Sequence, residues 1–308
     1  MTLALIVNPH AGGGRAGREL ERVQAALTER GIEHHAELTR SLDHARQLTA
    51  GAVAAGETAV AFGGDGLIGA VADVLRSGDG VLGILPGGRG NDFARALGIP
   101  QDPVAACAVL ADGAIARLDM GQVGAHTFIG IASCGFDSIA NRIANETTLV
   151  RGNLVYAYGA LRALAGWRPA TFTVTIDGAQ SRAVTGFTVA VANSNFYGGG
   201  MRLAPDADLR DGMLDVVIIL KMRKLRFLRL LPTVFRGEHV NYPEVEVIRT
   251  PSVRISASRP FTLFADGDPI SELPVTVRVL RAAVRAIVPA AVADPDAAAA
   301  RAPSPAGP

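Results

Sequence analysis

The chain has 308 residues, with 30 Lys and Arg against 29 Asp and Glu, and a formal net charge of +1. Hydrophobic residues make up 49% of it and charged residues 19%, which excludes a disordered or fibrous protein. The balanced charge argues against electrostatic binding to nucleic acid, and two cysteines are too few for a disulfide framework or a thiolate zinc site. We expect a two-domain cytoplasmic protein, because the length suits two domains and neither a signal peptide nor a membrane-spanning apolar segment is visible.

Short apolar runs alternate with helical stretches through the first third of the chain. The predicted strands are Leu3–Val7, His35–Leu38, Thr58–Phe62 and Val81–Leu85. The predicted helices are Ala16–Arg30, Leu42–Ala54 after an N-cap at Ser41, Leu67–Arg76, and Asn91–Leu97. This order predicts a parallel sheet with helices on both faces, and such sheets bind ligands at the carboxyl ends of their strands.

Three glycine-rich turns follow predicted strands, so we expect all three at that carboxyl edge. They are Asn8–Arg15, Gly63–Gly66 and Pro86–Asn91. Glycine lets backbone amides approach an anion, and a helix N-terminus behind it favours phosphate. For the first turn, a phosphate site and a ligand-free strand-to-helix turn fit equally. The chain lacks the P-loop pattern, and no acidic residue ends the second strand, which weakens a dehydrogenase interpretation.

Acidic and amide side chains lie within these turns. Asp65 stands between glycines, where a carboxylate can hold magnesium directly or through water during phosphoryl transfer. The alternative for Asp65 is an N-cap of the helix that follows. In the third turn, Asn91 or Asp92 caps the next helix as readily as either contributes to catalysis.

After Asp119 the pattern changes to β-strands, with a helical insertion near Ala140–Ala165 and a hairpin turn at Asp177-Gly178. The predicted strands are Thr171–Ile176, Ala183–Val191, Leu214–Leu220, Val245–Ile248, Val253–Ile255, Phe261–Phe264 and Val275–Leu280. We therefore expect a mainly antiparallel second domain. The predicted division is an α/β domain over 1–118, rejoined by about 281–290, a β-rich domain over 119–280, and a disordered Ala/Pro tail over 291–308.

The segment Lys221–Arg236 is basic and apolar at once, with six basic residues and no acidic one. Leu225, Leu228 and Leu231–Pro232 can form one helical stripe surrounded by arginines, a pattern typical of a helix that lies on an anionic bilayer. The alternative is an amphipathic helix packed on its own domain with a solvated basic face.

The ordered motifs resemble those of the bacterial diacylglycerol kinase-like lipid kinases, whose catalytic domain is shared with eukaryotic diacylglycerol, sphingosine and ceramide kinases. The matching motifs are Asn8-Pro9 with its glycine run, Gly63-Gly64-Asp65-Gly66, Pro86–Arg95, Asp119-Met120-Gly121, Gly135-Phe136-Asp137 and Asp211–Asp215. They cover nearly the whole chain. The resemblance implies an α/β nucleotide-binding domain followed by a mainly antiparallel β-sandwich, with the active site in the cleft between them.

The resemblance also implies a site for ATP and Mg²⁺. The implied nucleotide contacts are Asn8, Gly12, Gly13, Thr39, Gly63, Gly64, Asp65, Gly66, Gly88, Arg89 and Asn91. Asp65 and Asp119 would organise magnesium and its waters. The family's Asp-Gly-Glu motif supplies the base that accepts the proton of the acceptor hydroxyl, and it matches Asp266-Gly267-Asp268 here. Asp268 therefore stands in for a glutamate that is one methylene longer, and an ordinary hairpin turn is the alternative for this motif.

This chain departs from the family at two further positions. Leu67 and Arg89 stand where the family commonly has threonine, so two hydroxyl groups that could touch phosphate are lost. Arg89 is either a compensating phosphate donor or a surface arginine. A structural magnesium is also implied, held by the Asp211 side chain and the carbonyls of Asp208 and Met213. The alternative there is an Asp-Gly β-turn.

The resemblance implies an ATP- and magnesium-dependent kinase of phospholipid biosynthesis that phosphorylates a lipid hydroxyl, with diacylglycerol as first guess. Peripheral association with the inner face of the membrane is expected, and a homodimer stays open. Two alternatives stand beside it. One is an NAD kinase-like enzyme with a soluble substrate. The other is a homologue that binds nucleotide or lipid without turnover. The sequence does not identify the lipid, because acyl-chain pockets are built from interchangeable apolar residues.

Overall fold

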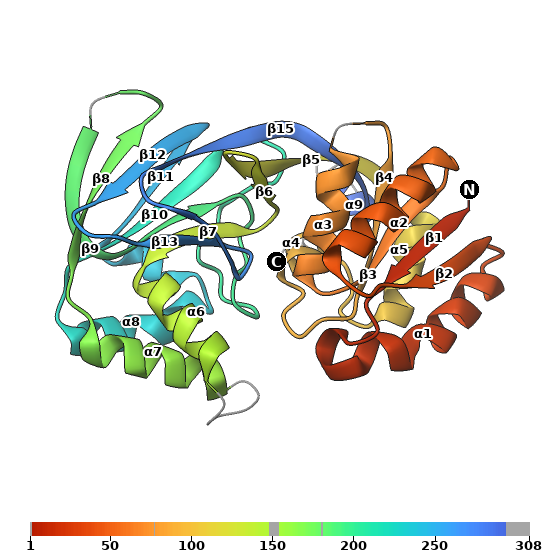
Figure 1. Ribbon diagram of the computed structural model, residues 1–308, viewed down its shortest axis with the longest axis horizontal. Helices are drawn as coiled ribbons and strands as arrows, with labels where there is room; N and C mark the ends of the chain where they lie inside the picture. Colours follow the sequence, from red (N-terminus) through yellow and green to blue (C-terminus); the bar gives the residue numbers. More distant parts are fainter. Residues whose placement is uncertain (1, 77, 148–153, 180, 294–308) are drawn as a thin grey trace, which may run out of the picture. The chain divides into compact units, whose positions relative to one another are not determined.

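A computed structural model describes residues 2–76, 78–147, 154–179 and 181–293 of the chain (Figure 1). The chain divides into two compact units, of which the first comprises Met1–Leu118 with Ala282–Pro308 and the second comprises Asp119–Arg281. The boundary falls within two long strands, β5 (Ala114–Val123) and β15 (Val275–Val288), which pair with each other. The second unit is therefore an insertion that leaves and rejoins the first through neighbouring strands.

The first unit is built on a parallel sheet. Its strands are β1 (Leu3–Val7), β2 (His34–Leu38), β3 (Thr58–Gly63) and β4 (Val81–Pro86), in the order β4-β3-β1-β2. The end of β15 joins β4 in parallel, with Arg285 opposite Val81. Every residue of β1 and β3 is buried, which explains why these strands are nearly continuous apolar runs instead of alternating ones. The predicted parallel sheet is confirmed.

Helices cover both faces of this sheet (Figure 1). They are α1 (Ala11–Glu29), α2 (Leu42–Ala54), α3 (Asp65–Leu75), α4 (Asp92–Ala96), α5 (Pro103–Asp112) and α9 (Ala290–Ala293). Helix α1 contacts α5, and α2 contacts α3. The chain moves from β1 to β2 in one direction and from β2 back past β1 to β3 in the other. Right-handed crossovers therefore place α1 and α2 on opposite faces, and the strand order reverses between β1 and β3.

Local sequence signals begin several of these helices. Ser41 Oγ accepts a hydrogen bond from the His44 N–H at 3.1 Å and caps α2, which has the predicted bounds. Asp102 caps α5 by accepting from the Val104 N–H at 2.8 Å, with Pro103 in the first turn. Helix α5 is absent from the predicted elements, because its nearly all-apolar sequence shows no helical periodicity. At the predicted tail, residues 290–293 form α9, and residues 294–308 lie outside the described residues.

The second unit is mainly antiparallel. Its remaining strands are β6 (His126–Phe128), β7 (Ile131–Gly135), β8 (Ala170–Ile176), β9 (Ser181–Ala192), β10 (Leu214–Leu220), β11 (Val245–Thr250), β12 (Ser252–Ala257), β13 (Thr262–Ala265) and β14 (Asp268–Glu272). Strand β9 pairs with β8 over its first half and with both β7 and β10 over its second half. The sheet divides at β9, which gives the sandwich-like arrangement that the sequence predicted.

Helices complete the core of this unit. They are α6 (Phe136–Glu146), α7 (Leu154–Gly166), α8 (Lys224–Val234) and the short 3-10 helix η1 (Glu238–Asn241). Aromatic side chains from strands and helices share one core, in which Phe187 and Phe227 stack with ring centroids 4.2 Å apart. Helices α6 and α7 correspond to the predicted insertion, and the residues between them, 148–153, lie outside the described residues. No helix in the described part of the chain has the length and hydrophobicity of a transmembrane span.

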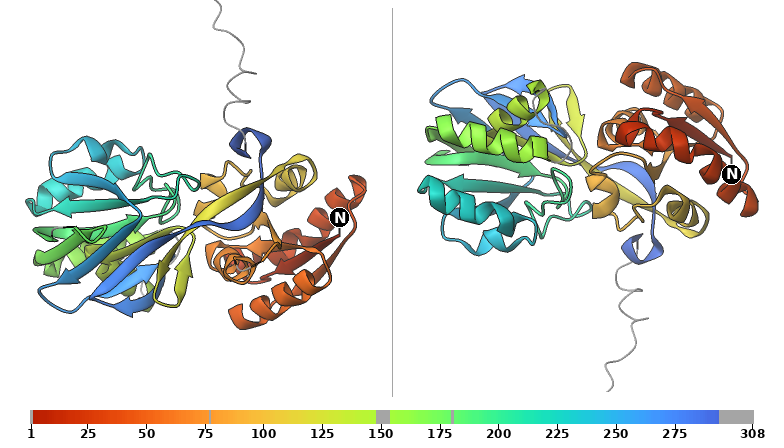
Figure 2. Two further views of the ribbon diagram at one scale, coloured as in Figure 1. Left: turned by 90° about the horizontal axis from the view of Figure 1, so that it is seen from above. Right: turned by 90° about the horizontal axis from the view of Figure 1, so that it is seen from below.

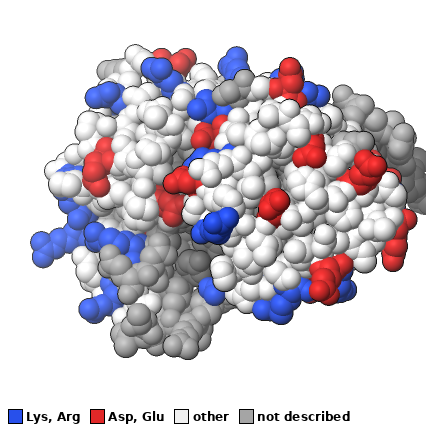
Figure 3. All heavy atoms as spheres, turned by 45° about the vertical axis from the view of Figure 1, so that its right-hand side comes forward, with Lys and Arg blue, Asp and Glu red and all other residues white. Residues whose placement is uncertain are grey.

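The orientation of α8 differs from the predicted stripe. Phe227, Leu230 and Val234 are its buried residues, and Leu228 packs partly buried against the core, whereas Leu225 is 62% exposed. The predicted stripe placed Leu225 and Leu228 on one apolar face; in the structure an aromatic residue sets the buried face instead. Helix α8 thus packs on its own unit, next to α7 (Figure 2). Lys and Arg side chains gather at the lower left of the face drawn in Figure 3.

Candidate active site

The three glycine-rich turns lie in backbone contact at the carboxyl ends of β1, β3 and β4. The N–H groups of Gly87 and Gly88 both donate to the carbonyl of Gly63, at 2.7 and 3.1 Å. A Cβ atom on Gly12 would lie 2.4 Å from the Gly87 carbonyl oxygen, and one on Gly88 would lie 2.6 Å from the Gly64 Cα. Only glycine permits these approaches. The turns thus meet beside the β1/β3 reversal, where open α/β sheets bind ligands.

The first turn has the backbone of an anion-binding loop. Gly12, Gly13 and Gly14 have φ of 61°, 70° and 87°, and the regular part of α1 begins after them. Asn8 Oδ1 accepts from the His10 N–H at 3.1 Å and shapes the start of the turn. A Cβ on Gly13 would meet nothing within 4 Å, so the turn borders open space. Consecutive glycine amides ahead of a helix N-terminus are suited to phosphate.

Asp65 joins the second turn to the third. Its Oδ2 accepts from the Asp92 N–H at 3.1 Å, and its Oδ1 accepts from the Phe93 N–H at 3.0 Å. Asp65 therefore caps α4, whereas its own helix α3 begins after Gly64 without a side-chain cap. The sequence alternative of a cap on α3 is therefore wrong, because Asp65 caps α4 instead. Each carboxylate oxygen keeps a further lone pair for a water or a metal ion, so Asp65 fits the magnesium role as well.

The third turn is shaped by Asn91, which is 2% exposed and has a left-handed φ of 50°. Its Oδ1 accepts from the Gly88 N–H at 2.7 Å, and its Nδ2 donates to the Gly88 carbonyl at 3.2 Å and to Gln101 Oε1 at 3.3 Å. Asn91 thus holds the turn, and Arg89 is exposed at its tip. Arg89 is therefore accessible to an anion.

The remaining nucleotide candidates also lie around these turns. Thr39 follows β2, is buried, and donates its N–H to the Val7 carbonyl at 2.7 Å. Gly66 is exposed in the first turn of α3. Leu67 is 3% exposed, and its Cδ2 would be 2.8 Å from a Cβ on Gly63. An aliphatic core side chain thus occupies the position where the resemblance implied a hydroxyl.

Asp119 belongs to the second unit, whereas Asp65 belongs to the first. Asp119 is 2% exposed, and its Oδ2 accepts from the Gly212 N–H at 2.7 Å while its own N–H donates to the Leu209 carbonyl at 2.6 Å. Asp119 therefore fixes the loop before β10 inside its own unit. Its magnesium role stays a prediction.

The motif Asp266-Gly267-Asp268 forms the β13–β14 hairpin. Asp266 and Gly267 have φ of 50° and 97°, the positive values of a type I′ turn, and Ala265 pairs with Asp268. The hairpin that the sequence offered as an alternative is present. Asp268 begins β14 with an exposed side chain, so its carboxylate is accessible to a substrate proton. The turn and the base role are compatible.

The implied structural magnesium fits this structure less well. Asp211 Oδ1 accepts from the Met213 N–H at 2.8 Å, and Oδ2 forms an ion pair with Arg249. Asp208 Oδ1 accepts from the Arg210 N–H at 3.0 Å. The Asp-Gly turn, with a φ of 71° at Gly212, accounts for these contacts, and the arginine already neutralises the Asp211 carboxylate. A magnesium ion held by Asp211 and the carbonyls of Asp208 and Met213 stays a prediction.

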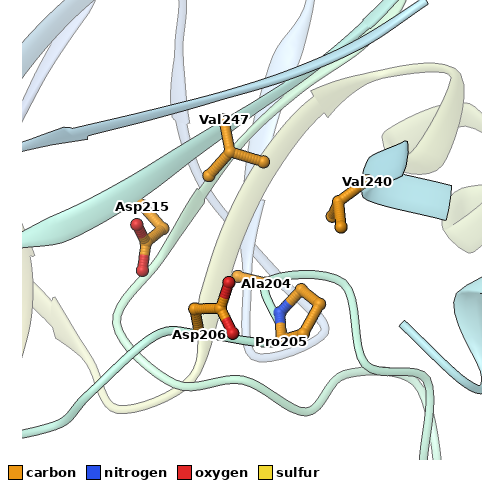
Figure 4. Close-up of a pocket in the computed structure, with 6 residues that line it drawn as sticks. All are labelled: Ala204, Pro205, Asp206, Asp215, Val240 and Val247. Carbon is orange, nitrogen blue, oxygen red and sulfur yellow. The ribbon is translucent and has the colours of Figure 1, made fainter. Parts of the chain in front are cut away.

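Two acidic side chains, Asp206 and Asp215, line a cavity of about 290 Å³ in the second unit (Figure 4). Burial, with a smaller contribution from the neighbouring Asp206, raises the pKa of Asp215 to about 6. Arg249 Nε lies 3.6 Å from Asp215 Oδ1, too far for a hydrogen bond, so loss of solvation prevails. Burial likewise raises the pKa of Asp137 to about 6, although Thr188 Oγ1 donates to it at 3.0 Å.

Comparison with known proteins identifies the family of the chain. The diacylglycerol kinase catalytic domain model matches residues 2–123, and the YegS C-terminal NAD kinase beta sandwich-like domain model matches residues 130–288. A diacylglycerol kinase of Mycobacterium tuberculosis is 35% identical over 292 residues, which are 92% of this chain and 94% of that protein. A diacylglycerol kinase of Bacillus subtilis is 31% identical over 276 residues, 88% of this chain and 90% of that protein.

Solved structures show the same fold. A diacylglycerol kinase from Bacillus anthracis aligns with a TM-score of 0.73 and 20% identity over 94% of this chain and 98% of that chain. An NAD kinase from Archaeoglobus fulgidus in complex with ATP aligns with a TM-score of 0.50 and 12% identity, over 98% and 99% of the two chains. The resemblance drawn from the sequence is confirmed. The chain belongs to the family of the bacterial diacylglycerol kinases and YegS-like lipid kinases.

Proposed function

We propose that the protein is an ATP- and Mg²⁺-dependent kinase that transfers the γ-phosphoryl group of ATP to the hydroxyl group of diacylglycerol. Family membership supports a lipid kinase. The observation that carries the nucleotide part is the backbone contact of three glycine turns at the β1/β3 reversal. The diacylglycerol kinases among the relatives supply the choice of acceptor.

In this proposal the chain's own groups do three things. The amides of Gly12 and Gly13 bind the phosphates, because these glycines have left-handed φ values ahead of a helix N-terminus and Gly13 borders open space. Arg89 donates to a phosphate oxygen from its exposed position. Asp268 accepts the proton of the lipid hydroxyl as that oxygen bonds to the γ-phosphorus, and ADP leaves with the bridging oxygen. Magnesium, when bound near Asp65, with Asp119 as the second predicted carboxylate, offsets the negative charge of the phosphates.

The decisive experiment uses Asp268. Asp268→Ala should lower kcat for labelled ATP and diacylglycerol vesicles by about 10²- to 10⁴-fold, the usual contribution of a general base. The thermal unfolding temperature should not change, since the side chain is exposed. Asp268→Glu restores the residue of the family motif and serves as the matched control, with activity at least equal to the parent. Retained activity in Asp268→Ala would remove the assigned base.

The same assay separates the alternatives. A panel of acceptors that contains diacylglycerol, sphingosine, ceramide, phosphatidylglycerol and NAD identifies the labelled product. Label on NAD alone would establish the soluble-substrate kinase. ATP binding without any labelled product across the panel would favour the non-catalytic homologue. That alternative is suggested by the departures from the family motifs at Leu67, Arg89 and Asp268. Label on diacylglycerol supports the proposal, whereas label on another lipid of the panel keeps the lipid kinase and replaces the proposed acceptor.

We further propose that the protein binds its lipid acceptor at an anionic membrane surface, which it contacts through α7 and α8. Arg223 and Arg229 are exposed on or beside α8. Large apolar side chains are exposed on these helices or at the end of α8, with Leu161 at 58%, Leu225 at 62% and Phe235 at 55%. Exposed apolar residues among basic ones suit a surface of anionic lipid headgroups.

The two helices are joined at this surface. Lys224 Nζ donates to the Ala165 carbonyl at 2.9 Å, which connects the start of α8 to the end of α7. Arg226 instead pairs with Glu244 at 2.7 Å within the unit. The basic charge that remains available for lipid therefore centres on Lys221, Arg223 and Arg229.

A further inference from the structure

We infer that Asp266 is a positioning residue, which holds the turn that carries the proposed base Asp268; this inference rests on the proposed function. The Asp266 carboxylate accepts three consecutive backbone N–H groups. Its Oδ2 accepts from Ile129 at 2.9 Å, and its Oδ1 accepts from Gly130 at 2.9 Å and from Ile131 at 3.1 Å. A carboxylate in such a clamp is fixed in both position and orientation.

The type I′ geometry alone does not explain these contacts. Asp177 and Gly178 form a second turn of this kind, with φ of 45° and 71° and a hydrogen bond from the Ala179 N–H to the Ile176 carbonyl at 2.8 Å. Within the described residues, the exposed Asp177 carboxylate makes no hydrogen bond. An Asp-Gly pair is thus sufficient for the turn without a clamp. The three hydrogen bonds to the Asp266 carboxylate therefore have a role other than forming the turn.

The clamp extends a short strand pairing. Strand β13 pairs with β7 through Phe264 opposite Ser133 and Ala265 opposite Ala132. The Asp266 N–H adds a bond to the Ile131 carbonyl at 3.2 Å, and its carboxylate then spans the residues just before β7. Gly130 makes this approach possible, since a Cβ there would lie 2.5 Å from Asp266 Oδ1. The turn is therefore anchored at its first residue, two positions before Asp268.

The anchor continues to Asp119 through Asn193. The Asn193 Nδ2 donates to the Ile129 carbonyl at 2.9 Å and to the Asp119 carbonyl at 3.0 Å. The N–H groups of Asn193 and Ser194 donate to the Gly130 carbonyl at 2.9 and 3.2 Å. Asn193, Ser194 and Asp119 are each at most 2% exposed. One buried hydrogen-bonded frame thus links the predicted magnesium residue of this unit to the turn with the predicted base.

Displacement of a catalytic group by about 1 Å lowers the rate by about 10²-fold. Only Gly267 separates Asp266 from Asp268, so release of the clamp removes three of the hydrogen bonds that hold the turn with the exposed base in place. Asp266 contacts backbone amides and Asp268 meets the substrate, which makes the first a positioning residue. Loss of the clamp should therefore affect kcat, and leave the affinity for ATP unchanged.

The test compares Asp266→Asn and Asp266→Gly with Asp177→Asn and Asp177→Gly. Asparagine and glycine both favour the type I′ turn, so all four variants should keep their hairpins. We expect kcat with diacylglycerol vesicles, normalised to the ATP-binding fraction, to fall about 10- to 100-fold in both Asp266 variants. The KM for ATP should stay at the parent value. Both Asp177 variants should match the parent in kcat and KM.

Amide hydrogen exchange gives a readout independent of turnover. Exchange at Ile129, Gly130 and Ile131 should accelerate at least 10-fold in the Asp266 variants and stay at the parent rate in the Asp177 variants. If the folded Asp266 variants keep the parent kcat, or if these amides exchange at the parent rate, the inference is wrong. If Asp268→Ala retains activity while exchange accelerates in the Asp266 variants, the proposed base fails and the clamp stands.

Discussion

Asp65 has a structural task in this fold beside the magnesium role that we propose for it. It accepts the first two N–H groups of α4 and thereby holds the second glycine turn against the third. The sequence indicated both a cap and a magnesium ligand at this position, but it pointed to a cap on the helix that Asp65 itself begins. The helix actually capped starts 27 residues later, at Asp92, a pairing that only the fold creates.

Asp65→Ala should therefore lower both stability and ATP binding. Loss of the cap costs about 1 kcal/mol of unfolding free energy, measured by urea denaturation. ATP affinity in the presence of magnesium, measured by titration calorimetry, should fall at least 10-fold. Asp102→Ala is the matched control, since it removes the cap of α5 in the same unit and should lower stability equally with unchanged ATP affinity. Equal ATP affinity in the two variants would leave Asp65 with the structural task alone.

At the candidate site, too, some features could be predicted from the sequence and others could not. The glycine positions were predictable, because glycine is required wherever backbones approach closely, as Gly12 and Gly88 do. The clamp at Asp266 was not, because its donors Ile129–Ile131 are ordinary apolar residues 135 or more positions away. Apart from the missing Cβ of Gly130, these backbone donors leave no signature in side-chain identity.

For a single element, α8 shows that the sequence predicts the helix but not which of its faces is buried. Its sequence predicts an amphipathic helix, and the bounds Lys224–Val234 agree with that. The predicted apolar stripe began at Leu225, whereas Phe227 is 1% exposed and stacks on Phe187 with the ring planes 6° apart. With apolar residues at most positions of the helix, periodicity alone does not select the face. The aromatic partners in the sheet decide it.

Phe227→Ala should destabilise the second unit by about 3–5 kcal/mol, because it opens a cavity in an aromatic core. Urea denaturation followed by tryptophan fluorescence reports it, since Trp167, the only tryptophan of the chain, lies in the same core. Leu225→Ala is the control from the same helix and should change the unfolding free energy by less than about 0.5 kcal/mol. Similar losses in the two variants would contradict the assigned orientation of α8.

The strands were predicted unevenly for the same reason. Leu3–Val7 and Leu214–Leu220 have the predicted bounds, since the first is an uninterrupted apolar run and the second is apolar except for Asp215. Strands β5, β6 and β7 were missed. Their segment holds glycines and a histidine, and β7 consists largely of small residues that the sandwich buries. Burial by distant partners, not local propensity, makes that segment extended.

At the scale of the whole molecule, the fold class followed from the order of elements and the family motifs, and the comparisons confirm both. Composition and charge only excluded classes of protein, namely disordered, fibrous and electrostatically nucleic-acid-binding ones. The net charge of +1 conceals a local asymmetry, because the basic residues of 221–236 have no acidic neighbour in that segment. That asymmetry is the basis of the proposed membrane contact.

Charge reversal tests this contact on the intact protein. Arg223→Glu with Arg229→Glu should weaken co-sedimentation with phosphatidylglycerol vesicles by about 30-fold, since each basic residue near an anionic surface contributes about 1 kcal/mol. Vesicles of phosphatidylcholine should pellet little of either protein. Arg254→Glu with Arg278→Glu is the control, with the same change of net charge on exposed strand positions of the same unit. Binding by the α8 variant equal to that by the control would overturn the contact.

The chain crosses from the first unit to the second inside two strands that are partners in one sheet, β5 and β15. The insertion that begins at Asp119 therefore leaves and rejoins the first unit through strands that pair with each other. A short loop in place of residues 119–281 would leave all three glycine turns with their helices in a minimal chain of the first unit. For the same reason, the second unit can be exchanged in one step while the first unit keeps its three glycine turns.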